Sequence, residues 1–207
     1  MATSTISAPA WLGLDELEEQ VILMVGHLRA GLIDATSAFL DCDSRAARTL
    51  LAEDQMIDDL QEAVEDAVHS RLEQRLSLSV AEAHRLVSIL SAASSIERSG
   101  DLVQQLAWRT PQGVPRVMSA QARDTIRDMA RFVVDLWSRV ADRHEGDEVE
   151  SFVTLGELEA CRRRLCDEVT DGALSSRAVV DACQVAQLYE RIGQGAVRVM
   201  RTLRRSV

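Results

Sequence analysis

One short sequence element occurs twice in this chain, and it limits what the chain can fold into. The first copy is Ile96-Glu97-Arg98-Ser99-Gly100-Asp101, and the second, near the C-terminus, is Tyr189-Glu190-Arg191-Ile192-Gly193-Gln194. Apolar residues recur at helical spacing around both copies, so each copy is expected to lie within a helix. The repeat therefore predicts a tandem duplication of one helical unit.

The composition favours helices over sheets. Hydrophobic residues make up 46% of the 207 residues but aromatic residues only 3%, and there are three prolines. Such a chain is typical of long helices that pack through Leu, Val, Ile and Ala. A chain of this length can form one ordinary domain or two small bundles, and the repeat favours two. The predicted fold class is all-α, with two tandem three-helix bundles related by internal duplication.

Apolar periodicity predicts three long helices in each half of the chain. Asp43 and Ser44 are expected to cap the second helix, and Ser79 and Glu82 form a predicted capping box at the start of the third. The six predicted helices cover residues 14–40, 46–76, 80–108, 120–143, 149–169 and 176–205.

The boundary between the halves is marked by the stretch from Thr110 to Pro115, which contains two prolines and a glycine. We therefore expect a disordered N-terminus over residues 1–12, a first bundle over residues 13–109, a linker over residues 110–118 and a second bundle over residues 119–207.

The charge of the chain excludes some classes of partner. The formal net charge is −10, which repels nucleic-acid phosphates and anionic lipid headgroups.

The segment from Met1 to Ala10 lacks the basic start and apolar core of a signal peptide, and the longest aliphatic run, Val21 to Val25, is too short to span a bilayer. The cysteines lack C-x-x-C spacing, which predicts reduced thiols in the core. We expect a cytoplasmic protein that neither binds nucleic acid nor spans a membrane.

Two pairs of acidic residues have a spacing that suits a metal site. Asp54 and Asp58 are four residues apart in the predicted second helix, and Glu97 and Asp101 are four apart in the third. Residues at this spacing share one face of a helix, and a helical wheel at about 100° per residue places both pairs near the apolar side. Neighbouring carboxylates repel each other, so a positive group is expected between them. A divalent or ferric ion held by these oxygens is the favoured interpretation, and an arginine such as Arg98 is the alternative.

The second half keeps only part of this pattern. Two of its four equivalent positions are neutral, which is expected to weaken or abolish a cation site. Arg163 lies four residues after Glu159, so a network of arginine and glutamate is expected in place of the metal. Aligning Leu158 on Ile57 pairs Glu159 with Asp58, Glu190 with Glu97, Leu155 with Asp54 and Gln194 with Asp101.

In their order and spacing these features resemble the PhoU family of phosphate-signalling regulators, accessory proteins of phosphate transport systems. The resemblance covers nearly the whole chain, because each half ends in a helix with Glu-Arg-x-Gly and the helix before it carries an acidic pair or its remnant. It implies a metal cluster on the acidic motifs of the first half, at Asp54, Asp58, Glu97 and Asp101. Glu159 and Glu190 are then the remnants of a second site.

The resemblance also implies a function, that of a cytoplasmic, non-enzymatic adaptor. Such an adaptor negatively regulates phosphate-starvation signalling and phosphate uptake. Its implied partners are the ATPase of a phosphate ABC transporter, a sensor histidine kinase and a second copy of the chain in a homodimer. Contact with a membrane is implied only through these membrane partners.

Three alternatives stay open from the residues themselves. One is a diverged paralogue that acts as a metal-binding helical scaffold. Another is a metal-dependent hydrolase, since grouped carboxylates can hold ions that activate water; the sequence shows no evident base, nucleophile or glycine-rich phosphate loop beside the acids. The last is a plain scaffold whose acids serve only solubility, and it predicts no bound metal.

Overall fold

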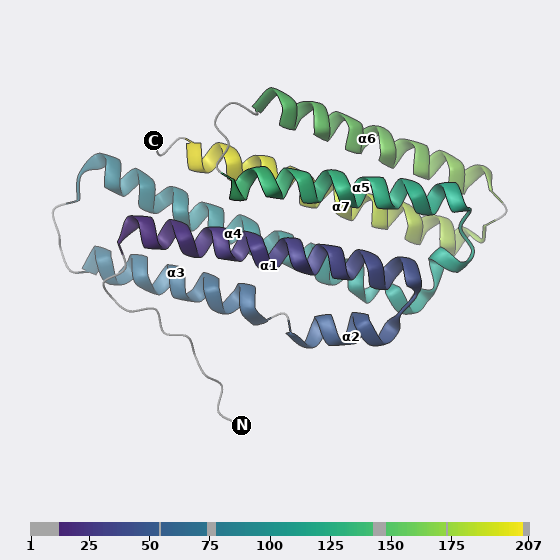
Figure 1. Ribbon diagram of the computed structural model, residues 1–207, viewed down its shortest axis with the longest axis horizontal. Coiled ribbons are helices and arrows are strands. Elements are labelled where there is room, and N and C mark those ends of the chain that lie inside the picture. The colour runs from purple at the N-terminus through teal and green to yellow at the C-terminus, as the bar shows by residue number, and fades with distance from the viewer. Residues whose placement is uncertain (1–12, 54, 74–77, 143–147, 173, 205–207) are drawn as a thin grey trace.

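The protein folds entirely into helices within the residues that the structure describes. This computed structural model describes residues 13–53, 55–73, 78–142, 148–172 and 174–204. The all-α fold class predicted from the sequence is confirmed (Figure 1). The elements are α1 (Leu14–Asp41), α2 (Ser44–Glu53), α3 (Gln55–Glu73), α4 (Val80–Trp108), η1 (Thr110–Gln112), η2 (Val114–Arg116), α5 (Ala120–Ala141), α6 (Glu148–Asp171) and α7 (Ser176–Arg204).

The predicted second helix differs from the observed one, because two helices, α2 and α3, take the place of a single helix over residues 46–76. Asp54 falls between them and lies outside the described residues, as do residues 1–12, where a disordered N-terminus was predicted. The predicted cap on this segment is present. The Asp43 carboxylate accepts hydrogen bonds from the backbone N–H groups of Arg45 (2.9 Å) and Ala46 (3.0 Å), and these bonds lower the pKa of Asp43.

The predicted capping box at the start of α4 is also confirmed. The Ser79 hydroxyl accepts a hydrogen bond from the backbone N–H of Glu82 at 3.2 Å, and the Glu82 carboxylate accepts one from the backbone N–H of Ser79 at 2.9 Å. These reciprocal bonds satisfy donors that have no partner inside the helix and fix the start of α4.

The two bundles pack along their length and share a core. Figure 1 shows α1, α4, α5 and α7 in the middle of the molecule, with α2 and α3 covering one side and α6 the opposite side. Contacts between the halves are made by α4 with α7 and by α1 with α5. One continuous cluster of buried apolar residues includes Leu28 of the first half and Trp137 of the second. The tandem arrangement agrees with the duplication, whereas the division into domains at the predicted boundaries stays a prediction.

The segment predicted as a linker is packed. Thr110, Val114 and Pro115 are buried within the turns η1 and η2. Gly113 joins these turns with φ of 67°, a left-handed conformation that glycine adopts without steric cost. The connection therefore holds α4 and α5 in a fixed relation.

Helix α1 is long and apolar enough to cross a membrane by length and composition alone, with a mean hydropathy of 1.3 over its most apolar stretch. Its apolar side chains have another role in the fold. Leu17, Val21 and Leu32 are completely buried where α1 packs against α4 and α5. The core position thus accounts for part of the apolarity of α1, while Leu23 and Ile33 of the same helix are exposed.

Candidate functional site

The glycine of each repeated element lets two consecutive helices approach closely. A Cβ atom built on Gly100 of α4 would lie 3.3 Å from Cδ1 of Ile57 in α3. In the second half, a Cβ atom on Gly193 of α7 would lie 2.8 Å from Cδ2 of Leu158 in α6. Ile57 and Leu158 therefore occupy equivalent places, which confirms the alignment of the two halves and explains the repeated glycine.

This close approach brings acids of α3 and α4 to a common surface. Asp58 follows Ile57, while Glu97 is on the turn of α4 before Gly100 and Asp101 directly follows it. Asp58 and Asp101 are exposed and Glu97 is half-buried, so the acids lie at the edge of the interface. The helical-wheel placement on the apolar side therefore describes Glu97 better than Asp58 or Asp101.

The electrostatics show that these acids interact. Partial burial raises the pKa of Asp58 above its ordinary value, and the charge of Asp101 raises it further. The pKa of Glu97 is raised first by burial and then by the charges of Asp101 and Asp58. Arg98 opposes this shift, but its guanidinium donates to the Ser95 hydroxyl at 3.3 Å. The surface therefore carries excess negative charge.

In the described part of the chain, Asp58, Glu97 and Asp101 take part in no ion pair. No three His, Cys, Asp or Glu side chains among the described residues are grouped closely enough to hold one metal ion. Asp54, the fourth predicted ligand, lies outside these residues. Metal binding by the four acids stays a prediction.

A further acid, Glu65, belongs to this surface, and the sequence reasoning missed it. Its charge contributes to the raised pKa of Glu97, and its carboxylate accepts a hydrogen bond from the Gln61 amide at 2.8 Å. Glu65 lies two helical turns after Asp58 on α3, so spacing along one helix face was the signal that could have revealed it.

The second half compensates its acids with arginine. Glu190 of α7 forms an ion pair with Arg162 of α6, with 2.8 Å between Oε2 and Nε. Glu159 forms one with Arg163 within α6, with 3.5 Å between Oε1 and Nη1. The predicted ion pair between Arg163 and Glu159 is confirmed, whereas its role in place of a metal stays a prediction. The sequence reasoning missed Arg162, which crosses between the helices.

The cysteines are free, as predicted. Cys42 and Cys161 are buried, and Cys166 and Cys183 are half-buried. Burial and the neighbouring Cys166 thiol raise the pKa of Cys183 to about 12. This favours the neutral thiol over the thiolate that binds metals.

Comparison with known proteins relates part of the chain to a described domain. The family model described as the PhoU domain matches residues 21–110. The PhoU domain of this chain therefore lies in its first half. The resemblance read from the sequence is confirmed.

Two solved PhoU structures share the fold of most of the chain. The crystal structure of PhoU from Pseudomonas aeruginosa has a TM-score of 0.80 and 20% sequence identity, over 92% of this chain and 94% of that chain. The phosphate transport system regulatory protein PhoU from Streptococcus pneumoniae has a TM-score of 0.76 and 17% identity, over 92% of each chain. No curated protein matches the sequence.

The domain match and the structural matches differ in how much of the two halves they cover. The match to the PhoU domain contains all four predicted acids of the first half and ends before the second half begins. The similarity to PhoU structures extends over both halves. The second half thus has the PhoU fold, with Leu155 and Gln194 at the positions aligned with Asp54 and Asp101 of the first half.

Proposed function

We propose that this protein is a cytoplasmic, non-enzymatic adaptor that negatively regulates phosphate uptake and phosphate-starvation signalling. In this role it links the ATPase of a phosphate ABC transporter to a sensor histidine kinase. The observation that carries the proposal is the PhoU domain over residues 21–110. The similarity of the whole fold to a phosphate transport system regulatory protein supports it.

We also propose that the first half binds one or more divalent or ferric ions through Asp54, Asp58, Glu97 and Asp101. The mutual repulsion that raises the pKa of Asp58 and Glu97 supports this proposal, because a cation would remove it. Oxygen ligands suit such hard cations. In the second half, Glu159 and Glu190 each have an arginine partner, so we propose that a metal is absent there.

The homodimer implied by the family stays a prediction, and multi-angle light scattering measures it directly. Within the residues that the structure describes, nothing in the geometry favours the hydrolase alternative. The paralogue alternative is favoured by one observation, the arginine-compensated acids of the second half. It predicts the same fold and the same first-half metal site with a different transporter or kinase as partner.

The test is a gene deletion in the source organism, followed by measurement of phosphate-regulon transcription in phosphate-rich medium. Complementation uses the native protein and a variant with Asp54→Asn, Asp58→Asn, Glu97→Gln and Asp101→Asn. A matched control carries Glu157→Gln and Asp167→Asn, two exposed acids of α6 in the other half of the chain.

We expect deletion to derepress transcription, and we expect the native protein and the control to restore repression while the site variant fails. Rescue by the site variant would show that the acids are dispensable. If deletion causes no derepression, the phosphate role is wrong and the paralogue alternative takes its place.

A further inference from the structure

A groove of about 380 Å³ lies between α6 and α7 in the diverged half of the protein. It occupies the place where the first half carries its acidic pairs, because Leu155 and Gln194 are the equivalents of Asp54 and Asp101. The groove is lined by Phe152, Leu155, Gln194, Val197, Arg198, Arg201 and Thr202.

The apolar part of this groove is accessible. Phe152 is 45% exposed, and its neighbour Val153 is 57% exposed. Leu155, which replaces an acid of the first half, packs partly against the core and also lines the groove. The groove can therefore accept an apolar side chain.

The rim of the groove is positively charged. Arg198 is exposed, and its side chain forms no ion pair in the described part of the chain. The guanidinium of Arg201 lies 4.5 Å from the centre of the Phe152 ring, so its cation is held at the apolar surface. Among the residues that the structure describes, no acidic side chain lines the groove. The charge of this rim is therefore opposite in sign to the net charge of the chain, which is −10.

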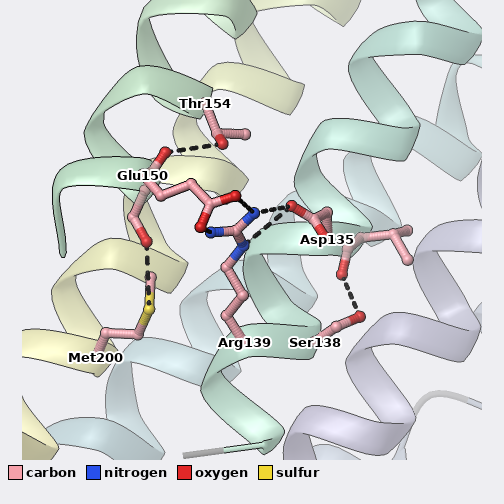
Figure 2. A network of polar contacts seen from close by, with 8 residues as sticks. Asp135, Ser138, Arg139, Glu150, Thr154 and Met200 are labelled. Carbon is pink, nitrogen blue, oxygen red and sulfur yellow. Dashed lines mark hydrogen bonds and ion pairs between the residues drawn. The ribbon is translucent and has the colours of Figure 1, made fainter. Parts of the chain in front are cut away.

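The helices that form the groove are held in place by polar contacts at the start of α6. Figure 2 shows Arg139 of α5 between Asp135 and Glu150, with ion-pair distances of 2.9 Å to each carboxylate. The neighbouring Ser151 hydroxyl, which is buried, donates to the Met200 sulfur of α7 at 3.7 Å. These contacts fix α6 against both neighbouring helices, and a preformed groove binds with a smaller loss of conformational entropy.

We propose that this groove binds an acidic, apolar segment of a partner protein. An apolar side chain of the segment enters between Phe152 and Leu155, and its carboxylates lie beside Arg198 and Arg201. A protein segment fits better than a membrane surface, because the net charge of the whole chain repels anionic lipid. The inference rests on the proposed adaptor function for the existence of a partner, and it places that partner on the second half.

The test selects random peptides, displayed on phage and long enough for several helical turns, against the immobilised full-length protein. Binding of the enriched peptides is then measured by fluorescence anisotropy with the native protein and with an Arg198→Gln, Arg201→Gln variant. A matched control, Arg127→Gln with Arg131→Gln, removes the same charge from exposed positions of α5. Circular dichroism and thermal unfolding check that both variants fold.

We expect the enriched peptides to combine acidic with leucine or aromatic residues. We expect them to bind the groove variant about tenfold more weakly than the native protein and the control. Equal binding to the two variants, or no enrichment of acidic apolar peptides, would overturn the proposal. So would charge-dependent binding to phosphatidylglycerol vesicles without peptide binding, which would make the groove a lipid site. Because these readouts use purified protein, they stand apart from the transcription test of the adaptor function.

Discussion

The hydroxyl groups of Thr36 and Tyr189 lie 2.8 Å apart in the core, although the two residues belong to different halves of the chain. The Thr36 hydroxyl donates its hydrogen to the Leu32 carbonyl at 2.7 Å, so Tyr189 is the donor to Thr36. Complete burial raises the pKa of Tyr189 well above its ordinary value, which keeps the phenol neutral and able to donate. This bond joins α1 to the repeated element of α7.

Removing that bond should lower the stability of the whole fold. We expect Tyr189→Phe to reduce the free energy of unfolding by about 1 kcal/mol, the net value of a buried hydrogen bond. Thr36→Val should cost more, about 1–3 kcal/mol, because it leaves the buried Tyr189 hydroxyl without an acceptor. Urea unfolding followed by circular dichroism measures both, with the exposed Ser37→Ala as control. Equal stability of native and Tyr189→Phe proteins would show that this contact contributes nothing.

Substitution by alanine should change the stability of the protein differently at the two repeated glycines. Alanine stabilises a helix interior over glycine by about 1 kcal/mol, but at Gly193 its Cβ would lie 2.8 Å from Leu158, and such overpacking costs about 1–3 kcal/mol. We therefore expect Gly193→Ala to be destabilising and Gly100→Ala, with a 3.3 Å approach to the tip of Ile57, to be nearly neutral. The control is Gly156→Ala, where nothing lies within 4 Å of the added Cβ and a gain is expected. Thermal unfolding ranks the three variants, and a stabilised Gly193→Ala protein would contradict the close approach.

Local sequence signals predicted the local structure well. The helices follow apolar periodicity, and the cap at Asp43 and the capping box of Ser79 and Glu82 involve residues only a few positions apart. The alignment of Ile57 with Leu158 also succeeded, because the repeat preserved the packing against glycine. The observed start of α3 beyond Asp54 was not predicted, since apolar periodicity continues through the segment.

Contacts between distant segments were the part that the sequence did not reveal. The bond between Thr36 and Tyr189 and the ion pair between Arg162 and Glu190 depend on how helices pack and rotate against each other. Periodicity places a residue on a helix face, but it does not say which residue of another helix it meets. For the same reason the sequence reasoning found Arg163, four residues from Glu159, and missed Arg162.

The stability of the metal-free protein should depend on pH through Asp58 and Glu97. Their pKa values are raised in the folded state, so the folded protein holds these protons more tightly than the unfolded chain. As the pH falls through the raised pKa values of the folded state, these carboxylates take up protons and their mutual repulsion is relieved. The free energy of unfolding therefore rises, and the rise is complete below the pKa values of the unfolded chain. In chelator, a variant with Asp58→Asn and Glu97→Gln should be more stable than the native protein at about pH 7, and this difference should shrink as the pH falls toward about 4. Urea unfolding across this range measures it; a difference that grows on acidification would contradict the sign of the shifts.

Adding metal should make the native protein more stable than the variant with neutral side chains, because a cation needs the charged carboxylates. A ligand that binds only the folded state stabilises it by about 2.7 kcal/mol at one hundred times its dissociation constant. We therefore expect Mn²⁺ or Fe³⁺ to raise the unfolding temperature of the native protein, and we expect no rise for a variant with Asp58→Asn, Glu97→Gln and Asp101→Asn. The control with Glu157→Gln and Asp167→Asn has lost exposed acids of α6 and should respond as the native protein does. An equal rise in the unfolding temperature of all three proteins would show that the ions bind the acidic surface nonspecifically. No rise for the native protein would show that the proposed metal binding is wrong.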